Sequence, residues 1–333
     1  MSDAAPSPLD PALIARAVAL LRAGELVALP TETVYGLGAD ALNPAAVARI
    51  FAAKGRPADH PLIVHLPDAE ALPRWAARIP KEAIALARAF WPGPLTLILP
   101  RSDEVPDLVT GGQDTVGLRV PNHPVALQLL RAFDSGIAAP SANRFGRISP
   151  TTARHVQEEL GDRVALVLDG GPCQVGIEST ILDLSRDVPE ILRPGAITPE
   201  AIAAVIGRQP TVRAQGGAQA PRVSGSLEAH YAPRTPLRIV QSARLRDVLN
   251  MRRHAGGRCA VIAHTQPPLA GEPHPWRLLP ANPAGYAHQL YAALREADAA
   301  GTDLIVLEAP PATVEWAAIN DRLRRAAAGA GRD

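Results

Sequence analysis

The chain has 333 residues, of which 47% are hydrophobic and 20% charged, and its formal net charge is +1. This length suggests about two domains with sizeable cores. The near-neutral charge gives no general attraction to nucleic acid, although it does not exclude a local basic patch. The start has no basic segment typical of a signal peptide, and no apolar run approaches the ~20 residues of a membrane span. The two cysteines, Cys173 and Cys259, lie in no paired spacing, which is typical of a reducing cytoplasm.

Helical and extended patterns alternate along the first 206 residues. Asp10-Pro11 and Asn43-Pro44 are typical helix starts, and Gly24 and Gly55 are typical helix ends. We expect helices over 10–24, 43–55, 81–90 and 123–132 and from Ser149-Pro150 onward, and strands over 25–30, 62–66, 95–99, 116–120, 137–139, 164–169 and 180–184. Because some connections are as short as hairpins, we predict an α/β domain with a twisted mixed sheet and flanking helices.

The rest of the chain reads as a linker and a second domain. Residues 207–236 are rich in Gln, Gly, Pro, Ala, Ser and Arg and have little periodicity. After them we expect a strand (237–240), a helix, a strand (259–263), a helix (284–299), a strand (304–307) and a terminal helix. The predicted organisation is a domain over 1–206, a linker over 207–236 and a small Rossmann-like three-layer α/β domain over 237–333.

One short charged segment, Lys54-Gly55-Arg56-Pro57, draws attention because the chain has only two lysines among its 34 basic residues. Lysine carries a compact ammonium and arginine a planar fork, so a retained lysine indicates a need for a point charge. One interpretation is a phosphate clamp. The other is an ordinary helix C-terminus, with Lys in the last turn, Gly after it and Pro beyond. The two interpretations are compatible.

Two familiar nucleotide motifs do not fit. The segment Gly36-Leu37-Gly38 resembles a dinucleotide fingerprint loosely, but no clean strand leads into it and the next helix begins too late, at Asn43. Neither lysine is followed by Ser or Thr, so there is no P-loop. Any ATP site must therefore be assembled from scattered residues.

Polar side chains lie at two candidate ligand-binding positions, one after the expected strand 137–139 and one at Arg193, which ends a further short strand. Ser141 and Asn143 lie on a small-residue turn after 137–139, where a hydroxyl and an amide can reach phosphate or ribose. Arg193 precedes Pro194-Gly195, a loop position that tolerates the approach of a ligand. Ser149 before Pro150 suits a helix N-cap as well as a ligand contact.

Arg119 lies on an otherwise apolar strand, so it needs an anionic partner. Asp114 or Glu178 could supply that carboxylate from within the protein, or the guanidinium fork could hold the carboxylate of a substrate. His65 ends another apolar strand, where a satisfied core histidine is the default. His60 is five residues away and no third ligand is near, which argues against zinc.

Seven motifs occur in a characteristic order. They are Pro30-Thr31-Glu32-Thr33-Val34-Tyr35-Gly36-Leu37-Gly38, Lys54-Gly55-Arg56 with His60-Pro61-Leu62-Ile63-Val64-His65, Trp91-Pro92-Gly93-Pro94-Leu95-Thr96, Val116-Gly117-Leu118-Arg119-Val120-Pro121, Ala139-Pro140-Ser141-Ala142-Asn143, Gly176-Ile177-Glu178-Ser179-Thr180 and Leu192-Arg193-Pro194-Gly195. Over about residues 10–205 they resemble the YrdC-like family of threonylcarbamoyl-AMP synthases. The later His230-Tyr231-Ala232-Pro233 and the C-terminal domain resemble the long, two-domain form.

The resemblance implies two sets of site residues. The ATP-binding set is Lys54, Arg56, His60, Thr115, Ser141, Asn143, Ser149, Arg193 and Tyr231, with Lys54 and Arg56 also catalytic, and the threonine-binding set is Thr33, His65, Arg119, Ala139 and Ser179. His60 departs from the family, which more often has asparagine there. The linker resembles a lid that would bring Tyr231 onto the nucleotide, although Tyr231 could instead pack between the domains. Glu32 and Glu178 flank the threonine pocket and could orient Arg119 or Lys54 or help to hold Mg²⁺, so the metal ligands stay unassigned.

The implied activity is the condensation of L-threonine, bicarbonate or CO₂, and ATP to threonylcarbamoyl-adenylate and pyrophosphate. The implied enzyme is a cytoplasmic nucleotidyltransferase that needs Mg²⁺ and has no membrane partner. Its product would be used by separate transferase proteins to modify the adenosine beside the anticodon, so contact with tRNA would be indirect or weak.

Two other classes of protein share some of these features. An RNA-binding protein would use the same cationic residues on the phosphate backbone, but the chain lacks aromatic-basic clusters. A carbamoyl-phosphate-dependent transferase would carry zinc-finger and acylphosphatase-like modules, which this chain lacks. Stabilisation by threonine together with ATP is expected of the synthase alone.

Overall fold

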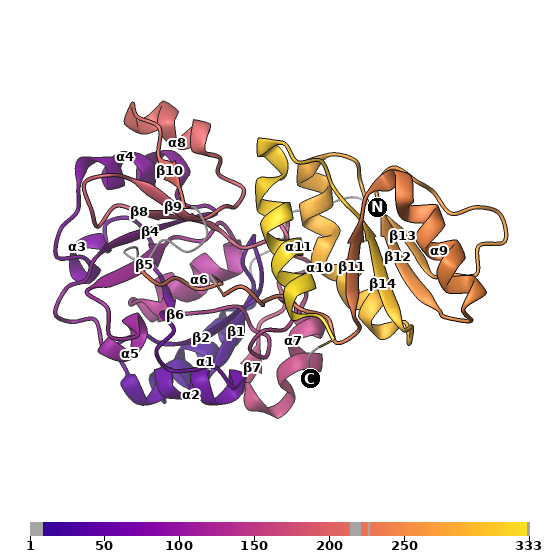
Figure 1. The fold of residues 1–333 in the computed structure, drawn as a ribbon. Helices are drawn as coiled ribbons and strands as arrows, with labels where there is room; N and C mark the ends of the chain where they lie inside the picture. The colour runs from indigo at the N-terminus through magenta and orange to yellow at the C-terminus, as the bar shows by residue number, and fades with distance from the viewer. Residues whose placement is uncertain (1–8, 214–220, 226, 332–333) are drawn as a thin grey trace. The chain divides into compact units, whose positions relative to one another are not determined.

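The structure is a computed structural model, which describes residues 9–213, 221–225 and 227–331 (Figure 1). The chain divides into two compact units. The first comprises Met1–Phe145, Pro150–Gln174 and Glu178–Ser226, and the second comprises Gly146–Ser149, Val175–Ile177 and Leu227–Asp333. The predicted two-domain α/β organisation is confirmed. Part of the predicted linker lies outside the described residues, so the boundaries of the domains and the linker stay predictions.

The first unit is built on a mixed sheet of ten strands in the order β10-β9-β8-β4-β5-β3-β6-β2-β1-β7. The strands are β1 Val27–Leu29, β2 Gly36–Asp40, β3 Ile63–His65, β4 Leu95–Pro100, β5 Thr115–Arg119, β6 Ile137–Ala138, β7 Leu166–Val167, β8 Thr180–Asp183, β9 Glu190–Arg193 and β10 Thr211–Val212. Parallel pairs such as β3 with β5 alternate with antiparallel pairs such as β4 with β5. The mixed sheet predicted from the short connections is therefore confirmed.

Helices cover both faces of this sheet. They are α1 Pro11–Arg22, α2 Pro44–Lys54, α3 Leu72–Trp75, α4 Lys81–Phe90, α5 Asp107–Thr110, α6 Pro124–Phe133, α7 Ala153–Leu160 and α8 Pro199–Ile206, with a 3-10 turn at Gly161–Arg163. On β1, Val27 and Leu29 pack into one core with α1 and α6, whereas Ala28 packs into another core with α2 and α4. Because successive strand residues point to opposite faces, these two cores lie on opposite sides of the sheet.

The predicted helix starts are explained by side-chain caps. Asp10 Oδ1 accepts a hydrogen bond from Ala12 N at 2.9 Å, and Asn43 Oδ1 accepts from Ala45 N at 3.1 Å. Gly55 ends α2 in the left-handed conformation at φ 63°, where a side chain would be strained. The helices predicted over 10–24, 43–55 and 81–90 are therefore confirmed to within a few residues.

One predicted helix start is wrong. The helix does not open at Ser149-Pro150, because α7 begins at Ala153 and its N-cap is Thr152, whose hydroxyl accepts from His155 N at 3.2 Å. The Pro150 carbonyl accepts a hydrogen bond from Tyr35 N at 2.9 Å instead. This long-range contact holds the Ser149-Pro150 segment outside the helix, and nothing in the local sequence announces it.

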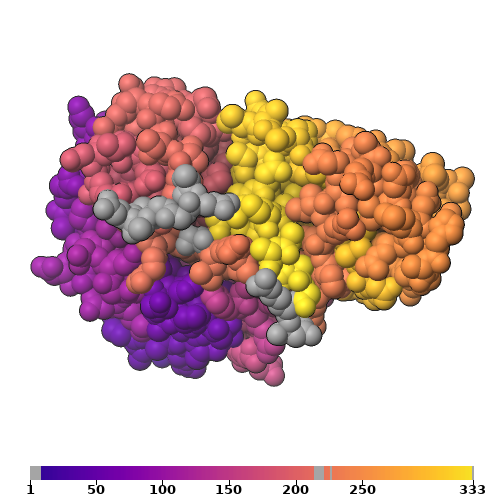
Figure 2. Space-filling view, in the orientation of Figure 1, coloured from indigo at the N-terminus to yellow at the C-terminus, as the bar shows by residue number. Residues whose placement is uncertain are grey.

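The second unit is a three-layer α/β unit with a parallel sheet in the order β11-β14-β12-β13. Its elements are β11 Leu237–Val240, α9 Leu245–His254, β12 Cys259–Ala263, β13 Trp276–Leu278, α10 Pro283–Ala299, β14 Leu304–Glu308 and α11 Ala317–Gly329, with 3-10 turns at Ser242–Arg244 and Val314–Trp316. Helix α9 covers one face of the sheet, and α10 and α11 cover the other (Figure 1). The orange segment that contains α9 forms part of the outer surface of this unit (Figure 2). Strand β13 was not predicted.

No helix in the described ranges is both long and apolar enough to cross a membrane.

Candidate functional site

Lys54 connects helix α2 to the turn after strand β6. Its side chain is 4% exposed, and Nζ donates hydrogen bonds to the carbonyl oxygens of Ser141 and Asn143, both at 2.5 Å. Burial, and then the nearby charge of Arg56, hold the pKa of Lys54 well below its usual value. Lys54 therefore serves as a helix C-terminus and also lies against the predicted Ser-x-Asn turn.

The Ser141–Asn143 turn is fixed from its other side by strand β2 and the residue before it. Leu37 N donates to the Pro140 carbonyl at 2.7 Å, and Ala142 N donates to the Tyr35 carbonyl at 2.8 Å. The turn therefore lies between the β2 segment and the end of α2. Strand β2, Gly36–Asp40, contains the two glycines of the loose dinucleotide motif, and it pairs with β1 and β6.

Arg56 and His60 follow Lys54 in the connection between α2 and β3, which we call the cationic segment. Arg56 Nη2 donates to the Pro61 carbonyl at 2.9 Å, which folds the guanidinium back over the segment. The ring of His60 meets the ring of Phe145 edge to face, with 5.3 Å between their centroids. Burial, and then Arg56, lower the pKa of His60 below its usual value, so its imidazole is neutral near pH 7. His60 therefore packs as a neutral imidazole against Phe145.

Arg119 ends strand β5 in a buried ion pair. Its Nη2 lies 2.8 Å from Glu32 Oε1, and the two side chains are only 5% and 3% exposed. Its Nε donates to the Gly93 carbonyl at 3.2 Å. Among the alternatives left open for Glu32, the structure thus favours the orientation of Arg119.

The neighbouring strand ends carry the other predicted threonine-binding residues. His65 pairs with Arg119 in the register of β3 and β5, and Ala139 N donates to the Ile63 carbonyl at 3.0 Å. Burial, and then Arg119, lower the pKa of His65 to about 3, so His65 is a neutral hydrogen-bonding group. Thr33 directly follows Glu32 in the sequence, and its hydroxyl oxygen lies 2.8 Å from that of Thr31.

Arg193 links the two predicted residue sets. Its Nε donates to the Ser179 carbonyl at 3.0 Å and its Nη2 to the Ser179 hydroxyl at 3.1 Å. Its Nη1 donates to the Ser224 carbonyl at 2.9 Å. The Ser179 hydroxyl also lies 2.7 Å from the hydroxyl of Thr96. Arg193, which is predicted to bind ATP, therefore holds Ser179, which is predicted to bind threonine.

The remaining three nucleotide candidates lie elsewhere. Thr115 begins β5, four residues before Arg119, which is ~13 Å along an extended strand. Ser149 belongs to the second unit, where its carbonyl accepts from Arg295 Nε at 3.5 Å. Tyr231 belongs to the second unit as well, so the first unit by itself does not contain the whole predicted set.

Tyr231 is buried among residues of its own unit and has a φ of 63°, which is uncommon for a bulky residue. Its ring stacks on Tyr291 at a centroid distance of 5.7 Å, and the guanidinium of Arg322 lies 5.4 Å from its centre. The next residue, Ala232, donates its backbone N–H to the Gly146 carbonyl at 2.8 Å. The His230–Pro233 motif is therefore an ordered part of the second unit.

Sequence reasoning missed the roles of backbone groups. The Gly93 carbonyl, in the Trp91–Pro94 turn, accepts a hydrogen bond from Arg119, and two more carbonyls hold Lys54. Main-chain oxygens have no side-chain signature, so no sequence signal could have found them. Thr96 has one weak signal, since it is a polar residue inside the apolar strand β4.

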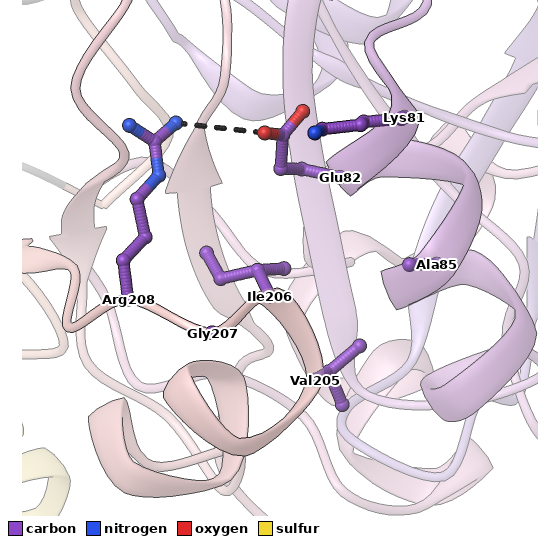
Figure 3. A pocket seen from close by; sticks show the side chains of 7 residues that line it. All are labelled: Lys81, Glu82, Ala85, Val205, Ile206, Gly207 and Arg208. Atoms are coloured by element: carbon purple, nitrogen blue, oxygen red, sulfur yellow. Dashed lines mark ion pairs between the residues drawn. The ribbon is translucent and has the colours of Figure 1, made fainter.

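A surface pocket of about 490 Å³ lies apart from these residues, between the start of α4 and the end of α8. Figure 3 shows its apolar wall of Val205 and Ile206 and its charged rim of Lys81, Glu82 and Arg208. None of the predicted site residues lines it. The described residues also contain no group of three His, Cys, Asp or Glu side chains that could hold a metal ion.

The chain matches two family models. One, described as "Telomere recombination" and named for Sua5, YciO and YrdC, covers residues 19–195, and the other, described as "Threonylcarbamoyl-AMP synthase, C-terminal domain", covers residues 197–328. Threonylcarbamoyl-AMP synthases from Pyrococcus abyssi and Bacillus subtilis are 41% and 43% identical to it. The alignments cover 93% and 95% of this chain and 92% and 93% of those proteins.

A solved structure of similar architecture is that of P. abyssi Sua5 complexed with L-threonine. It superposes with a TM-score of 0.91 at 38% identity, over 97% of this chain and 96% of that one. Sequence, domain models and fold agree over nearly the full length. This chain therefore belongs to the threonylcarbamoyl-AMP synthase family.

Proposed function

We propose that the chain condenses L-threonine, bicarbonate or CO₂, and ATP into threonylcarbamoyl-AMP and pyrophosphate, the first step of threonylcarbamoyladenosine formation in tRNA. The names of the full-length relatives and the L-threonine complex of P. abyssi Sua5 support this reaction. The single observation that carries it is the Arg193–Ser179 contact, at 3.0 and 3.1 Å, because it ties a candidate phosphate-binding arginine to the candidate amino-acid pocket.

We propose that threonine is held at the ends of β3 and β5. Arg119 would bind the substrate carboxylate with its fork, since a buried guanidinium suits bidentate recognition of a carboxylate. His65, as a neutral imidazole, would hydrogen-bond the polar groups of the substrate. The rest of the proposed threonine set is Thr33, Ala139 through its backbone, and Ser179.

We propose that ATP is held by the cationic segment and the Ser-x-Asn turn. Arg56 and Arg193 would offset the charge of the triphosphate, and Ser141 would donate its hydroxyl. The full proposed set is Lys54, Arg56, His60, Thr115, Ser141, Asn143, Ser149, Arg193 and Tyr231. Of the two cations that the family resemblance names as catalytic, we propose that Arg56 acts on the phosphates and that Lys54 belongs to the set through the Ser-x-Asn turn. The burial of Lys54 and its contacts with the turn support its place in this set.

The chemistry needs no protein nucleophile. The threonine amine attacks the carbon of CO₂, which forms an N–C bond and, after loss of a proton, a carbamate. A carbamate oxygen then attacks the α-phosphorus of ATP, and the bond to the β-phosphate oxygen breaks to release pyrophosphate. This is a nucleotidyl transfer, so positioning and charge neutralisation should dominate catalysis. Exclusion of water protects the labile carbamate and mixed anhydride.

We propose that Mg²⁺ accompanies the triphosphate. No three-ligand cluster exists in the described part of the chain, so a cage built by the protein alone does not fit. Mg²⁺ is commonly bound through substrate phosphates and only one or two carboxylates. We assign no residue and no chemical step to it.

We propose that the product is passed to separate threonylcarbamoyl-transferase proteins, so that tRNA contact is indirect or weak. A cytoplasmic location is also proposed, with support from the two cysteines, Cys173 and Cys259, which are both free and buried. The stability of a mixed anhydride in water is limited, which favours rapid transfer to the next enzyme.

The test is pyrophosphate release from ATP and Mg²⁺, measured with and without L-threonine and bicarbonate. The proposal predicts release that needs both compounds. Release that is independent of threonine would indicate an ATP pyrophosphatase, and no release under any condition would overturn the proposal.

A further inference from the structure

We propose that Lys54 is a positioning residue, whose ammonium group holds the Ser141–Asn143 turn in the shape needed for nucleotide binding and does not itself contact the triphosphate. This inference rests on the proposed function and deepens it. It gives Lys54 a different task from Arg56, the other cation of the same segment.

The contacts of Lys54 hold the turn at three points. Nζ lies 2.5 Å from the Ser141 carbonyl and 2.5 Å from the Asn143 carbonyl, and the Lys54 carbonyl accepts from Phe145 N at 2.8 Å. Two of the three ammonium hydrogens are thus used on alternate carbonyls of the turn. One residue of α2 therefore fixes Ser141, Asn143 and Phe145 together.

The burial of this group supports the same assignment. Lys54 is 4% exposed, and a buried ammonium is stable only when hydrogen bonds satisfy it. The charged groups that act on it are Arg56, which disfavours its protonation, and Glu159, which favours it. A third ammonium hydrogen remains, but with only 4% of Lys54 exposed, a phosphate oxygen could reach Nζ only if the surrounding turn moved aside.

The geometry also explains why lysine was kept in a chain that otherwise uses arginine. Two carbonyls of one turn converge on a single point, which a compact ammonium can occupy. A planar guanidinium spreads its donors over a wider fork and matches a carboxylate or a phosphate better. The lysine thus fits the turn, whereas Arg56 has the side chain suited to the phosphates.

The first test uses the protein without ligand. In Lys54→Met, amide hydrogen exchange of residues 139–145 should quicken by about 5- to 100-fold relative to wild type, because two hydrogen bonds to the turn are lost. Lys81→Met is the matched control, since Lys81 is the other lysine of the chain and lies at the exposed start of α4 (Figure 3). If Lys54→Met does not fold, Lys54→Gln, which keeps an uncharged amide NH₂ on a shorter side chain, serves in its place. Unchanged exchange would overturn the proposal, even if the enzyme proves inactive.

The second test separates positioning from direct contact. Lys54→Met should raise the KM for ATP about 10- to 100-fold, while kcat at saturating ATP and the affinity for threonine change less than about threefold. Ser141→Ala should weaken ATP binding in the wild type but add little in the Lys54→Met background, because the turn is already displaced. Lys54→Arg should not restore the KM.

Fully additive effects of the two substitutions, or rescue by arginine, would show that Lys54 binds phosphate directly. Failure of wild type to bind ATP would instead count against the proposed function, and the exchange test would still decide the role of Lys54.

Discussion

Glu308 in the second unit and Glu32 in the first are both buried carboxylates, and their surroundings differ. In the second unit, Glu308 ends β14 and is fully buried. It accepts hydrogen bonds from the Ser242 hydroxyl at 2.7 Å, from His264 N at 2.7 Å, from Thr265 N at 3.0 Å and from the Thr265 hydroxyl. These donors follow β11 and β12, so one side chain ties together the ends of three parallel strands.

The surroundings of Glu308 stabilise its charge. Burial alone would raise the pKa of Glu308, but the hydrogen bonds from Ser242, Thr265 and His264 outweigh it and lower the pKa to about 2. A carboxylate whose acceptor capacity is used by its own neighbours has little left for a ligand.

In the first unit, Glu32 has fewer partners. It lies 2.8 Å from Arg119 Nη2, but neither of its oxygens has a described hydrogen-bond partner of good geometry. A buried ion pair of this kind contributes little net stability, because desolvation offsets the attraction. The comparison teaches that the hydrogen bonds of Glu308 are satisfied within its own unit, whereas Glu32 and Arg119 keep hydrogen-bonding capacity that the proposed threonine site would use.

The largest effect is expected from breaking the first-unit pair. Arg119→Ala would leave Glu32 buried without a counter-charge and should lower the free energy of unfolding by about 3–5 kcal/mol. It should also abolish threonine binding measured by calorimetry. Arg49→Ala removes an exposed arginine paired with Glu25 at 2.7 Å and should cost less than about 1 kcal/mol. An equal loss of unfolding free energy in the two variants would contradict the distinction between the buried and the exposed ion pair.

The second-largest effect is expected at Glu308, the carboxylate that accepts several hydrogen bonds within its own unit. Glu308→Gln should lower the free energy of unfolding by about 2–3 kcal/mol at pH 7, because it removes a carboxylate whose pKa is depressed on folding. Since the folded pKa is the lower one, this contribution is present above about pH 4.5 and is lost as the pH falls toward 2. Denaturation at several pH values measures it. A constant difference from wild type down to pH 3 would be inconsistent with this account.

The third effect is a pH dependence due to His65. Its folded pKa of about 3 lies below the usual 6.5, so the unfolded chain binds a proton that the folded chain does not. Stability should therefore fall with decreasing pH below 6.5, by about 1.4 kcal/mol per pH unit from this group. His65→Gln should flatten this slope between pH 6.5 and 5. Identical slopes in the two proteins would show that His65 is protonated in the fold.

Local signals in the sequence explain what could be predicted. Asp10, Asn43 and Gly55 act within one or two turns of their own helices, so the bounds of α1 and α2 follow from the chain itself. Strand β2 escaped prediction because glycines dominate it and its pairing with β1 and β6 is a tertiary contact. The prediction of a helix start at Ser149 was wrong because the hydrogen bond from Tyr35 N to the Pro150 carbonyl holds the backbone outside the helix there.

The same limit applies to the candidate site. The motifs pointed to Lys54, Arg119 and Ser179, and Glu32 was one of several carboxylates considered as a partner of Arg119, but the sequence could neither choose among these carboxylates nor indicate the partners of Lys54. The partners proved to be main-chain oxygens for Lys54 and a distant carboxylate, Glu32, for Arg119. Such contacts depend on which strand ends meet, and only the assembled sheet determines that.

The most direct measurement of the central claim is the fate of bicarbonate carbon. The protein would be incubated with ATP, Mg²⁺, L-threonine and ¹³C-bicarbonate, and the nucleotide products would be separated and weighed by mass spectrometry. The account predicts a threonylcarbamoyl-adenylate that carries the ¹³C label and is absent without threonine. Cleavage of ATP with no labelled adenylate would contradict the account.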